Sequence, residues 1–304
     1  MTEVRFDGKV VAVTGAGRGL GAAYARLLAE RGASVVVNDL GTKMDGGGSS
    51  TEAADRLVAE IRREGGKAVA NYSDIADPAQ AGAIVADAVA GFGRLDALIN
   101  NAGIISTNSF PELTTDLLQR QLNVHLFGAL NVTQAAWPAL VESRGAVVFT
   151  VSAGMLGSRH TVAYNVAKAS VLGLMRSVAC EGAAAGVRVN AVMPGAETRM
   201  QGTALDADSA ENSARRTTDV NSAANAAPLA CFLAHESCRA NGEVFATGRG
   251  HMAKILLASS EGVSERDPSL ESVAAGFERI RSLTELREET DLRTYRDRLI
   301  EVWN

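Results

Sequence analysis

Short apolar runs alternate with longer amphipathic stretches through the first three-quarters of the chain. Seven runs are almost continuous in valine, isoleucine, leucine and alanine: KVVAVTG, SVVVND, KAVANYSD, ALINNAG, GAVVFTVS, VRVNAVMPG and GEVFATG. Runs of this kind are typical of strands that are buried on both faces of a parallel sheet. The pattern therefore predicts an α/β fold built on a doubly wound parallel sheet.

The stretches between these runs have the apolar period of helices. They predict helices at residues 19–31, 50–64, 78–91, 116–141 and 163–185. Parallel strands need such crossover connections, so the order of strands and helices agrees with the predicted sheet. The last two helices are apolar on more than one face, which indicates a contact with another subunit.

Three segments interrupt the alternation. Residues 41–50 are rich in glycine and serine and predict a flexible loop, whereas residues 195–220 are polar and predict a loop over an active site. After Gly250 the strand pattern ends, and the remaining residues are charged and mostly helical in period. We therefore expect a domain at residues 1–250, with residues 251–304 as a helical C-terminal extension of the same domain.

Composition and charge exclude several classes of protein. The chain has 304 residues, of which 46% are hydrophobic, and a formal net charge of −5 with scattered basic residues, which argues against nucleic acid or an anionic membrane as the partner. The charged N-terminus lacks the apolar core of a signal peptide, and no apolar run approaches the roughly 20 residues of a membrane span. The three cysteines show no metal-ligand spacing. We expect a cytoplasmic protein with reduced thiols and no metal.

A glycine-rich turn follows the first predicted strand. Glycines stand at positions 15, 17, 19 and 21 between a strand and a helix, and Asp39 follows the last of them by about 20 residues. Such glycines let backbone N–H groups approach a pyrophosphate, and such a carboxylate accepts a hydrogen bond from a ribose 2′-hydroxyl. The carboxylate would repel a 2′-phosphate, which favours NAD over NADP. Arg18 argues the other way, because a basic residue in this loop can meet a 2′-phosphate, but Leu40 adds no second cation.

Small and polar residues stand where three further predicted strands end. The carboxyl ends of parallel strands meet at one edge of a sheet, and ligands bind there. The residues in these positions are Asn101, Ala102, Gly103, Ser152, Pro194 and Gly195.

Tyr164 and Lys168 lie four positions apart in a predicted helix, so they share a face. In isolation such a pair is most often an ordinary surface feature. Here it accompanies a nicotinamide motif, and an alcohol that is oxidised must lose its hydroxyl proton while hydride leaves. A phenol has a pKa near 10, too high for a base at neutral pH, and a neighbouring ammonium lowers it. With Ser152 to hold the substrate oxygen, the three side chains predict oxidation of an alcohol.

The motifs TGAGRGLG, NNAG, SAG…YNVAK and PGAET occur in this order and resemble the short-chain dehydrogenase/reductase family over about residues 8–250. The resemblance implies a Rossmann fold, catalysis by Ser152, Tyr164 and Lys168, and a homodimer or homotetramer built through the two long helices. Together with the glycine motif it predicts a cofactor site made up of Gly15, Arg18, Gly19, Leu20, Gly21, Asp39, Leu40, Asp74, Ile75, Asn101, Ala102, Gly103, Tyr164, Lys168, Pro194, Gly195 and Thr198.

A narrower resemblance covers VVVNDLG with its insertion, GGKAVANY, VHL, AAW and GRGHMAKILL. These segments are similar to the (3R)-hydroxyacyl-CoA dehydrogenase domains of peroxisomal multifunctional enzymes type 2, a group that includes 17β-hydroxysteroid dehydrogenase type 4. The resemblance implies a (3R)-3-hydroxyacyl-CoA as the small-molecule substrate. The alternatives are a hydroxysteroid, a CoA ester from steroid degradation, and a non-catalytic NAD-binding sensor, against which the intact Ser152, Tyr164 and Lys168 argue.

Two positions depart from the family pattern. His125 stands where many members have an asparagine that completes a proton relay, so it either relays protons or packs within its helix. Ser152 precedes Tyr164 by 164 − 152 = 12 positions, one fewer than is common, and counting back from Tyr164 would select Val151. Aligning along the strand selects Ser152, which we favour because a surface loop tolerates a deletion.

Overall fold

The structure is a computed structural model that describes residues 3–196 and 222–301. The expected loop at residues 195–220 therefore lies almost wholly outside the described residues, as does Thr198. The chain divides into two compact units, Met1–Ala253 and Lys254–Asn304, and we describe each by itself.

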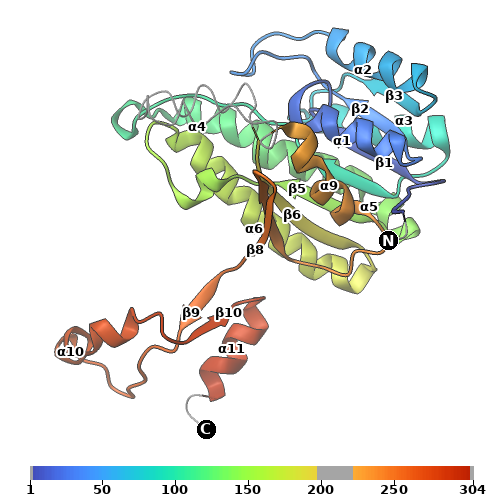
Figure 1. The fold of residues 1–304 in the computed structure, drawn as a ribbon. Helices are drawn as coiled ribbons and strands as arrows, with labels where there is room; N and C mark the ends of the chain where they lie inside the picture. The colour runs from blue at the N-terminus through green and yellow to red at the C-terminus, as the bar shows by residue number, and fades with distance from the viewer. Residues whose placement is uncertain (1–2, 197–221, 302–304) are drawn as a thin grey trace. The chain divides into compact units, whose positions relative to one another are not determined.

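The first unit is built on a sheet with the strand order β3-β2-β1-β4-β5-β6-β7-β8 (Figure 1). All the pairings from β3 to β7 are parallel, which confirms the predicted doubly wound α/β fold. The seven apolar runs form the first seven strands, which are β1 (Val10–Thr14), β2 (Ser34–Asn38), β3 (Lys67–Asn71), β4 (Ala97–Asn100), β5 (Ala146–Thr150), β6 (Arg188–Gly195) and β7 (Val244–Gly248).

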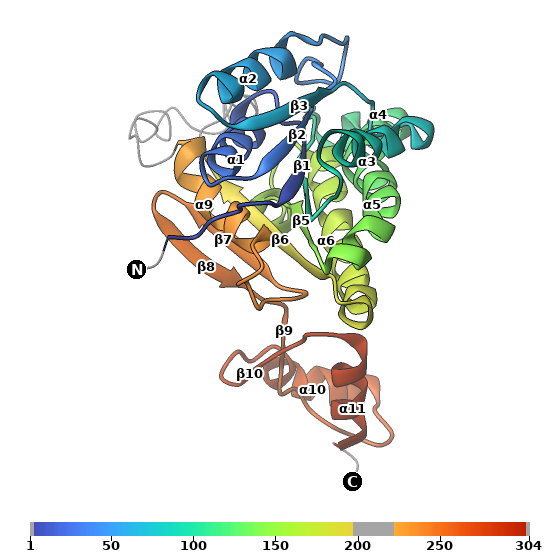
Figure 2. The ribbon, with the colours of Figure 1, turned by 90° about the vertical axis from the view of Figure 1, so that its right-hand side faces the viewer.

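Helices cover both faces of this sheet (Figure 2). One face is covered by α1 (Gly19–Glu30), α2 (Glu52–Arg63) and α9 (Ala223–Ala234), with α1 packed on α9. The other is covered by α3 (Pro78–Phe92), α5 (Ala129–Ser143) and α6 (Val162–Ala185). Short helical turns occur at η1 (Phe110–Glu112) and η3 (Ala153–Leu156).

Local chemistry explains why the elements begin and end where they do. All five residues of β1 are buried, as expected for a central strand between two helical layers. Helix α3 begins at Pro78, and the side chain of Asp77 accepts a hydrogen bond from Ala79 N at 2.9 Å. The same helix ends at Phe92, and its C-cap residue Gly93 has a φ of +82°, the left-handed conformation that glycine adopts most easily.

Three elements differ from the expectations. The long helix predicted at residues 116–141 consists of α4 (Thr115–Leu122), a π-helical segment η2 (Asn123–Gly128) and α5. The strand pattern does not end at Gly250, because β8 (His251–Ile255) joins the sheet next to β7 after a two-residue turn. Both turn residues, Arg249 and Gly250, have positive φ, as hairpin turns that match the strand twist require. Helix α9 was not predicted, since its alanine-rich sequence has little amphipathic contrast.

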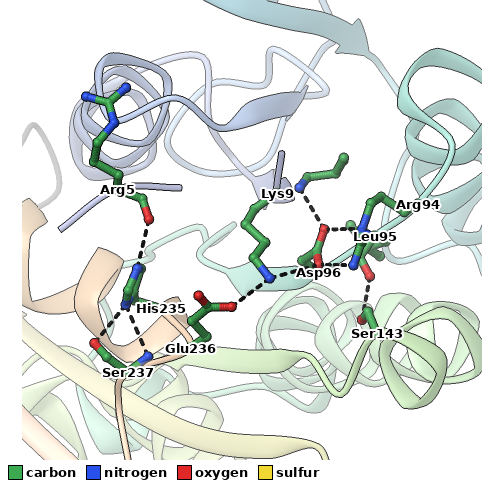
Figure 3. A network of polar contacts seen from close by, with 10 residues as sticks. Arg5, Lys9, Arg94, Leu95, Asp96, Ser143, His235, Glu236 and Ser237 are labelled. Atoms are coloured by element: carbon green, nitrogen blue, oxygen red, sulfur yellow. Dashed lines mark hydrogen bonds and ion pairs between the residues drawn. The ribbon is translucent and has the colours of Figure 1, made fainter. Parts of the chain in front are cut away.

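A network of charged side chains holds the amino-end edge of the sheet (Figure 3). The Asp96 carboxylate, with only 9% of the side chain exposed, accepts from Val10 N at 2.9 Å and binds the Arg94 guanidinium through two hydrogen bonds of 2.7 and 2.9 Å. Lys9 lies 3.9 Å from the same carboxylate and pairs with Glu236 at 2.7 Å. This network joins the starts of β1 and β4 to the segment after α9.

The second unit contains both strands and helices. Strands β9 (Ala258–Ser260) and β10 (Leu286–Glu288) pair antiparallel, and α10 (Leu270–Ile280) and α11 (Leu292–Glu301) are the two helices expected in this region. A capping box between Ser269 and Ser272 starts α10. None of residues 254–296 is buried, so this unit has no core of its own among the residues described.

Candidate active site

A pocket of about 650 Å³ lies at the carboxyl ends of the parallel strands. It brings together segments that are far apart in the sequence, namely the turns after β1 and β2 and the ends of β4, β5 and β6. The predicted site residues that line it are Gly15, Arg18, Gly19, Leu20, Asp39, Leu40, Asp74, Ile75, Asn101, Ala102, Gly103, Ser152, Tyr164, Lys168, Pro194 and Gly195.

Two predicted site residues in the described part of the chain do not line this pocket. Gly21 lies beneath the glycine turn, where a Cβ atom would overlap the carbonyl oxygen of Gly15. It allows close packing between the turn and α1 rather than contact with a ligand. His125 is buried behind the pocket wall.

Asn101 ties the end of β4 to the glycine turn. Its side-chain amide donates to the carbonyl oxygens of Thr14 and Gly15, both at 3.0 Å, while its backbone N–H donates to the Thr14 hydroxyl. A Cβ atom on Gly15 would lie 2.7 Å from Ala102 Cα, so only glycine fits at this crossing. These contacts fix the turn against the neighbouring strand.

Asp39 occupies the position expected for a ribose-binding carboxylate. One oxygen accepts from Gly17 N and the other from Gly41 N, each at 2.7 Å. Each carboxylate oxygen has a second lone pair, so the group can still accept a hydrogen bond from a hydroxyl.

The glycine turn and the start of α1 are suited to bind a dinucleotide. Helix α1 begins at Gly19, and its N-cap residue Arg18 provides no side-chain hydrogen bond, which leaves the first backbone N–H groups of the helix for another acceptor. The glycine turn, the uncapped helix start and Asp39 all border one pocket.

Ser152 and Tyr164 lie together at the end of β5. A Cβ atom on Gly154 would be 3.3 Å from the Tyr164 ring and 3.4 Å from Ser152 Oγ, so this glycine lies against both side chains. Burial raises the pKa of Tyr164, and a hydrogen bond with Ser152 acts in the opposite direction. Val151, the other candidate by spacing, is 1% exposed and belongs to the core.

Lys168 is buried one helical turn after Tyr164. Its ammonium donates to the carbonyl oxygen of Thr150 at 2.7 Å and lies 6.0 Å from the centre of the Tyr164 ring. Burial lowers the pKa of Lys168 to about 7. The lysine is therefore only partly protonated near neutral pH. The electrostatic effect of its charge on the tyrosine changes with pH over the same range.

His125 lies behind the pocket wall, in the π-helical segment η2. Its ring meets the Tyr164 ring edge-on, with 5.4 Å between centroids, and its Nε2 lies 2.8 Å from the carbonyl oxygen of Ile104. Nδ1 is buried without a hydrogen-bond partner. Burial, together with the positive charge of Lys168, holds the pKa of His125 well below its ordinary value, so the ring is neutral.

The pocket also contains residues that the sequence did not single out. Thr42, Lys43, Met44 and Gly46 come from the insertion after β2, and Ile104 and Ile105 follow β4. The insertion has the composition of a loop, and no local signal indicates which surface it contacts.

No helix in the described part of the chain is long and apolar enough to cross a bilayer. Within residues 3–196 and 222–301, no group of three or more histidine, cysteine or acidic side chains is arranged to hold a metal ion.

Several known proteins are similar to this chain over most of its length. A profile of the short chain dehydrogenase family matches residues 9–209. The chain is 44% identical over 258 residues to mouse peroxisomal multifunctional enzyme type 2, a match that covers 83% of this chain and 33% of that protein. A protein of Mycobacterium tuberculosis that carries the name short-chain type dehydrogenase/reductase is 38% identical, over 91% of this chain and 95% of its own length.

The fold comparison extends to the C-terminal unit. The structure of full-length peroxisomal multifunctional enzyme type 2 from Drosophila melanogaster matches with a TM-score of 0.78 and 30% identity, over 98% of this chain and 50% of that one. The chain thus spans about a third of the length of the mouse enzyme and half of the Drosophila structure.

Proposed function

The chain belongs to the short-chain dehydrogenase/reductase family, and we propose that it is an NAD-dependent dehydrogenase that converts a (3R)-3-hydroxyacyl-CoA to the 3-oxoacyl-CoA. Family membership makes it an oxidoreductase that acts on CH–OH groups. The observation that carries the proposal is the meeting of Ser152, Tyr164 and Lys168 at the strand ends, in the same pocket as the glycine turn.

In the proposed reaction the Tyr164 hydroxyl is the group that exchanges a proton with the substrate oxygen. Ser152, which lines the same pocket as Tyr164, is placed to hold the same oxygen. Lys168 lies behind the tyrosine and, in its protonated form, favours the phenolate. A bound nicotinamide supplies the acceptor for the hydride that leaves the carbinol carbon.

NAD is proposed over NADP because of Asp39. Its carboxylate lies at the end of β2, where the two backbone N–H groups that it accepts from hold it in place. A 2′-phosphate next to this carboxylate would meet like charge, whereas a 2′-hydroxyl would donate a hydrogen bond. Arg18 also lines the pocket and argues for NADP, but Leu40, the residue after Asp39, adds no second cation for a 2′-phosphate.

The acyl-CoA substrate is proposed from the resemblance to multifunctional enzymes.

Dimerisation is proposed from family membership, through α6 and the helical stretch formed by α4, η2 and α5. It is supported by exposed apolar side chains such as Phe127 of η2 and Val166 of α6, which are 41% and 43% exposed.

The test is a set of initial rates of NAD reduction, followed by absorbance. The substrates are (3R)- and (3S)-3-hydroxyacyl-CoAs of several chain lengths and a 17β-hydroxysteroid, with NADP as the cofactor control. We expect the (3R)-acyl-CoAs to react fastest, with NAD preferred. Activity on the steroid alone would move the substrate to the second candidate, a hydroxysteroid. Binding of NAD without reduction on any substrate would favour a sensor.

A further inference from the structure

The insertion after β2 is a compact loop with its two ends joined. Ser50 N donates to the carbonyl oxygen of Leu40 at 3.0 Å, and Gly41 N donates to the Asp39 carboxylate. Gly41 has a φ of +75°, and a Cβ atom there would overlap the Ser50 carbonyl oxygen, so the closure needs glycine. Compact loops of this size with joined ends are often functional.

The far end of the loop is attached to the segment that follows β4. Ile105 N donates to the carbonyl oxygen of Met44 at 3.0 Å. A Cβ atom on Gly46 would lie 3.2 Å from two side-chain carbons of Ile104, so the backbone of the loop rests on that side chain. Within the loop, Lys43 N donates to Gly47 O and Gly46 N to Lys43 O, which forms a tight turn.

These attachments place the loop across the cofactor cleft. The sheet order puts β1 between β2 and β4, so a segment that leaves β2 and contacts the end of β4 must cross the position of β1. The glycine turn follows β1, and both the turn and residues 42–46 border the same pocket. A crevice at the point where the strand order reverses is where open α/β sheets bind ligands. We call residues 41–50 the strap.

The strap brings a positive charge to this cleft. Three described cationic residues line the pocket: Arg18, Lys43 and Lys168. Lys168 donates a hydrogen bond to the carbonyl oxygen of Thr150 at the catalytic end of the pocket. Lys43 forms no ion pair with any residue that the structure describes, and the acid nearest in sequence, Asp45, accepts from Gly47 N within the turn. A pyrophosphate carries two negative charges, and a lysine on a flexible stem is well suited to bind one.

We propose that the strap is the outer wall of the cofactor cleft and that Lys43 binds the pyrophosphate of the dinucleotide from the side opposite the glycine turn. The inference rests on the proposed cofactor site, and it adds a cationic side chain to the backbone N–H groups of the turn. It also assigns a role to an insertion that the composition alone marks as a linker-like loop.

The test measures dissociation constants of NADH, ADP-ribose and adenosine for the wild type and three variants. Lys43→Ala removes the charge, and Lys43→Arg keeps it. Lys67→Ala is the matched control, since Lys67 is exposed at the start of β3, at the opposite edge of the sheet. We expect Lys43→Ala to weaken NADH and ADP-ribose about tenfold, which corresponds to one charged contact, with adenosine unchanged. Lys43→Arg should stay close to the wild type, and Lys67→Ala should have no effect.

Three results would overturn the proposal separately. Equal NADH affinity in Lys43→Ala and the wild type would remove the role of the lysine. If Lys43→Ala lowered the affinity for adenosine as much as that for NADH, the strap would have collapsed and no phosphate contact would be demonstrated. Rapid hydrogen exchange of the Ile105 amide in the wild type would show that the strap is not attached. A wild type that binds neither NADH nor NADPH would instead refute the proposed function.

Discussion

Both edges of the sheet contain a buried ionisable side chain, but only the one at the amino edge is paired with opposite charges. At the amino edge, Asp96 is surrounded by Arg94, Lys9 and a backbone N–H, so the buried carboxylate is fully paired (Figure 3). At the carboxyl edge, Lys168 is buried with a single carbonyl acceptor and no carboxylate among the described residues. The first arrangement stabilises the fold, whereas the second reduces its stability and leaves a reactive group.

The buried groups that reduce stability therefore lie at the carboxyl edge of the sheet, next to the pocket. Buried charges are tolerated when they are paired, and an unpaired one shifts its pKa instead. Lys168 does so, and two buried polar atoms near it have no hydrogen-bond partner: Thr150 Oγ1 in the pocket lining and His125 Nδ1 behind it. We therefore expect substitutions at the carboxyl edge to affect activity and those at the amino edge to affect stability.

The largest effect is expected at Tyr164. Tyr164→Phe keeps the ring that packs on His125 and removes the hydroxyl that we propose exchanges the proton, so kcat should fall by about 10³-fold. Thermal unfolding and NADH affinity should remain as in the wild type, because the pocket loses only one polar atom. Initial rates and NADH titration measure both. Unchanged NAD reduction in this variant would contradict the catalytic role of Tyr164.

The next effect is expected at the opposite edge. Asp96→Ala leaves Val10 N without its acceptor and Arg94 without its partner, and should lower the free energy of unfolding by about 2 kcal/mol, since Arg94 is half exposed and partly screened. Urea unfolding measures this change. Asp96→Asn keeps an acceptor and should lose less. In both variants kcat/KM per folded molecule should equal that of the wild type, and a large drop would break the division between the two edges.

Lys168 should make the free energy of unfolding depend on pH. Its pKa in the folded protein is about 7, below the ordinary value of 10.5, so between these values the unfolded chain binds more protons and stability rises with pH. Lys168→Met removes this contribution. The variant should be more stable than the wild type at pH 6.5, and the difference should shrink as the pH rises toward 10.

Urea unfolding of both proteins over this pH range isolates the lysine, because all other titrating groups are shared. Parallel stability curves would show that Lys168 keeps its ordinary pKa. Loss of activity in the variant without loss of stability would be a further sign that the carboxyl edge is built for chemistry.

The smallest effect is expected at His125. The ring is neutral, does not line the pocket and meets Tyr164 edge-on, so we expect it to act as a positioning residue. His125→Leu should lower kcat by about tenfold and leave both the KM and the shape of the pH profile unchanged. An altered pH profile would instead support the proton-relay role, and restoration of kcat by His125→Gln would separate a hydrogen-bond effect from packing.

The sequence determined the framework of this protein. Continuous apolar runs such as the one that forms β1 have no stable place except in a sheet covered on both faces, so the doubly wound fold followed from local patterns. The glycine turn and Asp39 were predictable for the same reason, because their conformations depend on residue type and on neighbours in the chain.

Other features depend on contacts between distant segments, and only the tertiary structure decided them. The placement of Ser152 beside Tyr164 needed the packing of α6 against the turn after β5, and the strap needed the bond between Met44 and Ile105. The pKa of Lys168 depends on its burial, which no motif encodes. Local patterns specify strands, helices and turns, whereas the environment of a side chain is set by all the segments that pack around it.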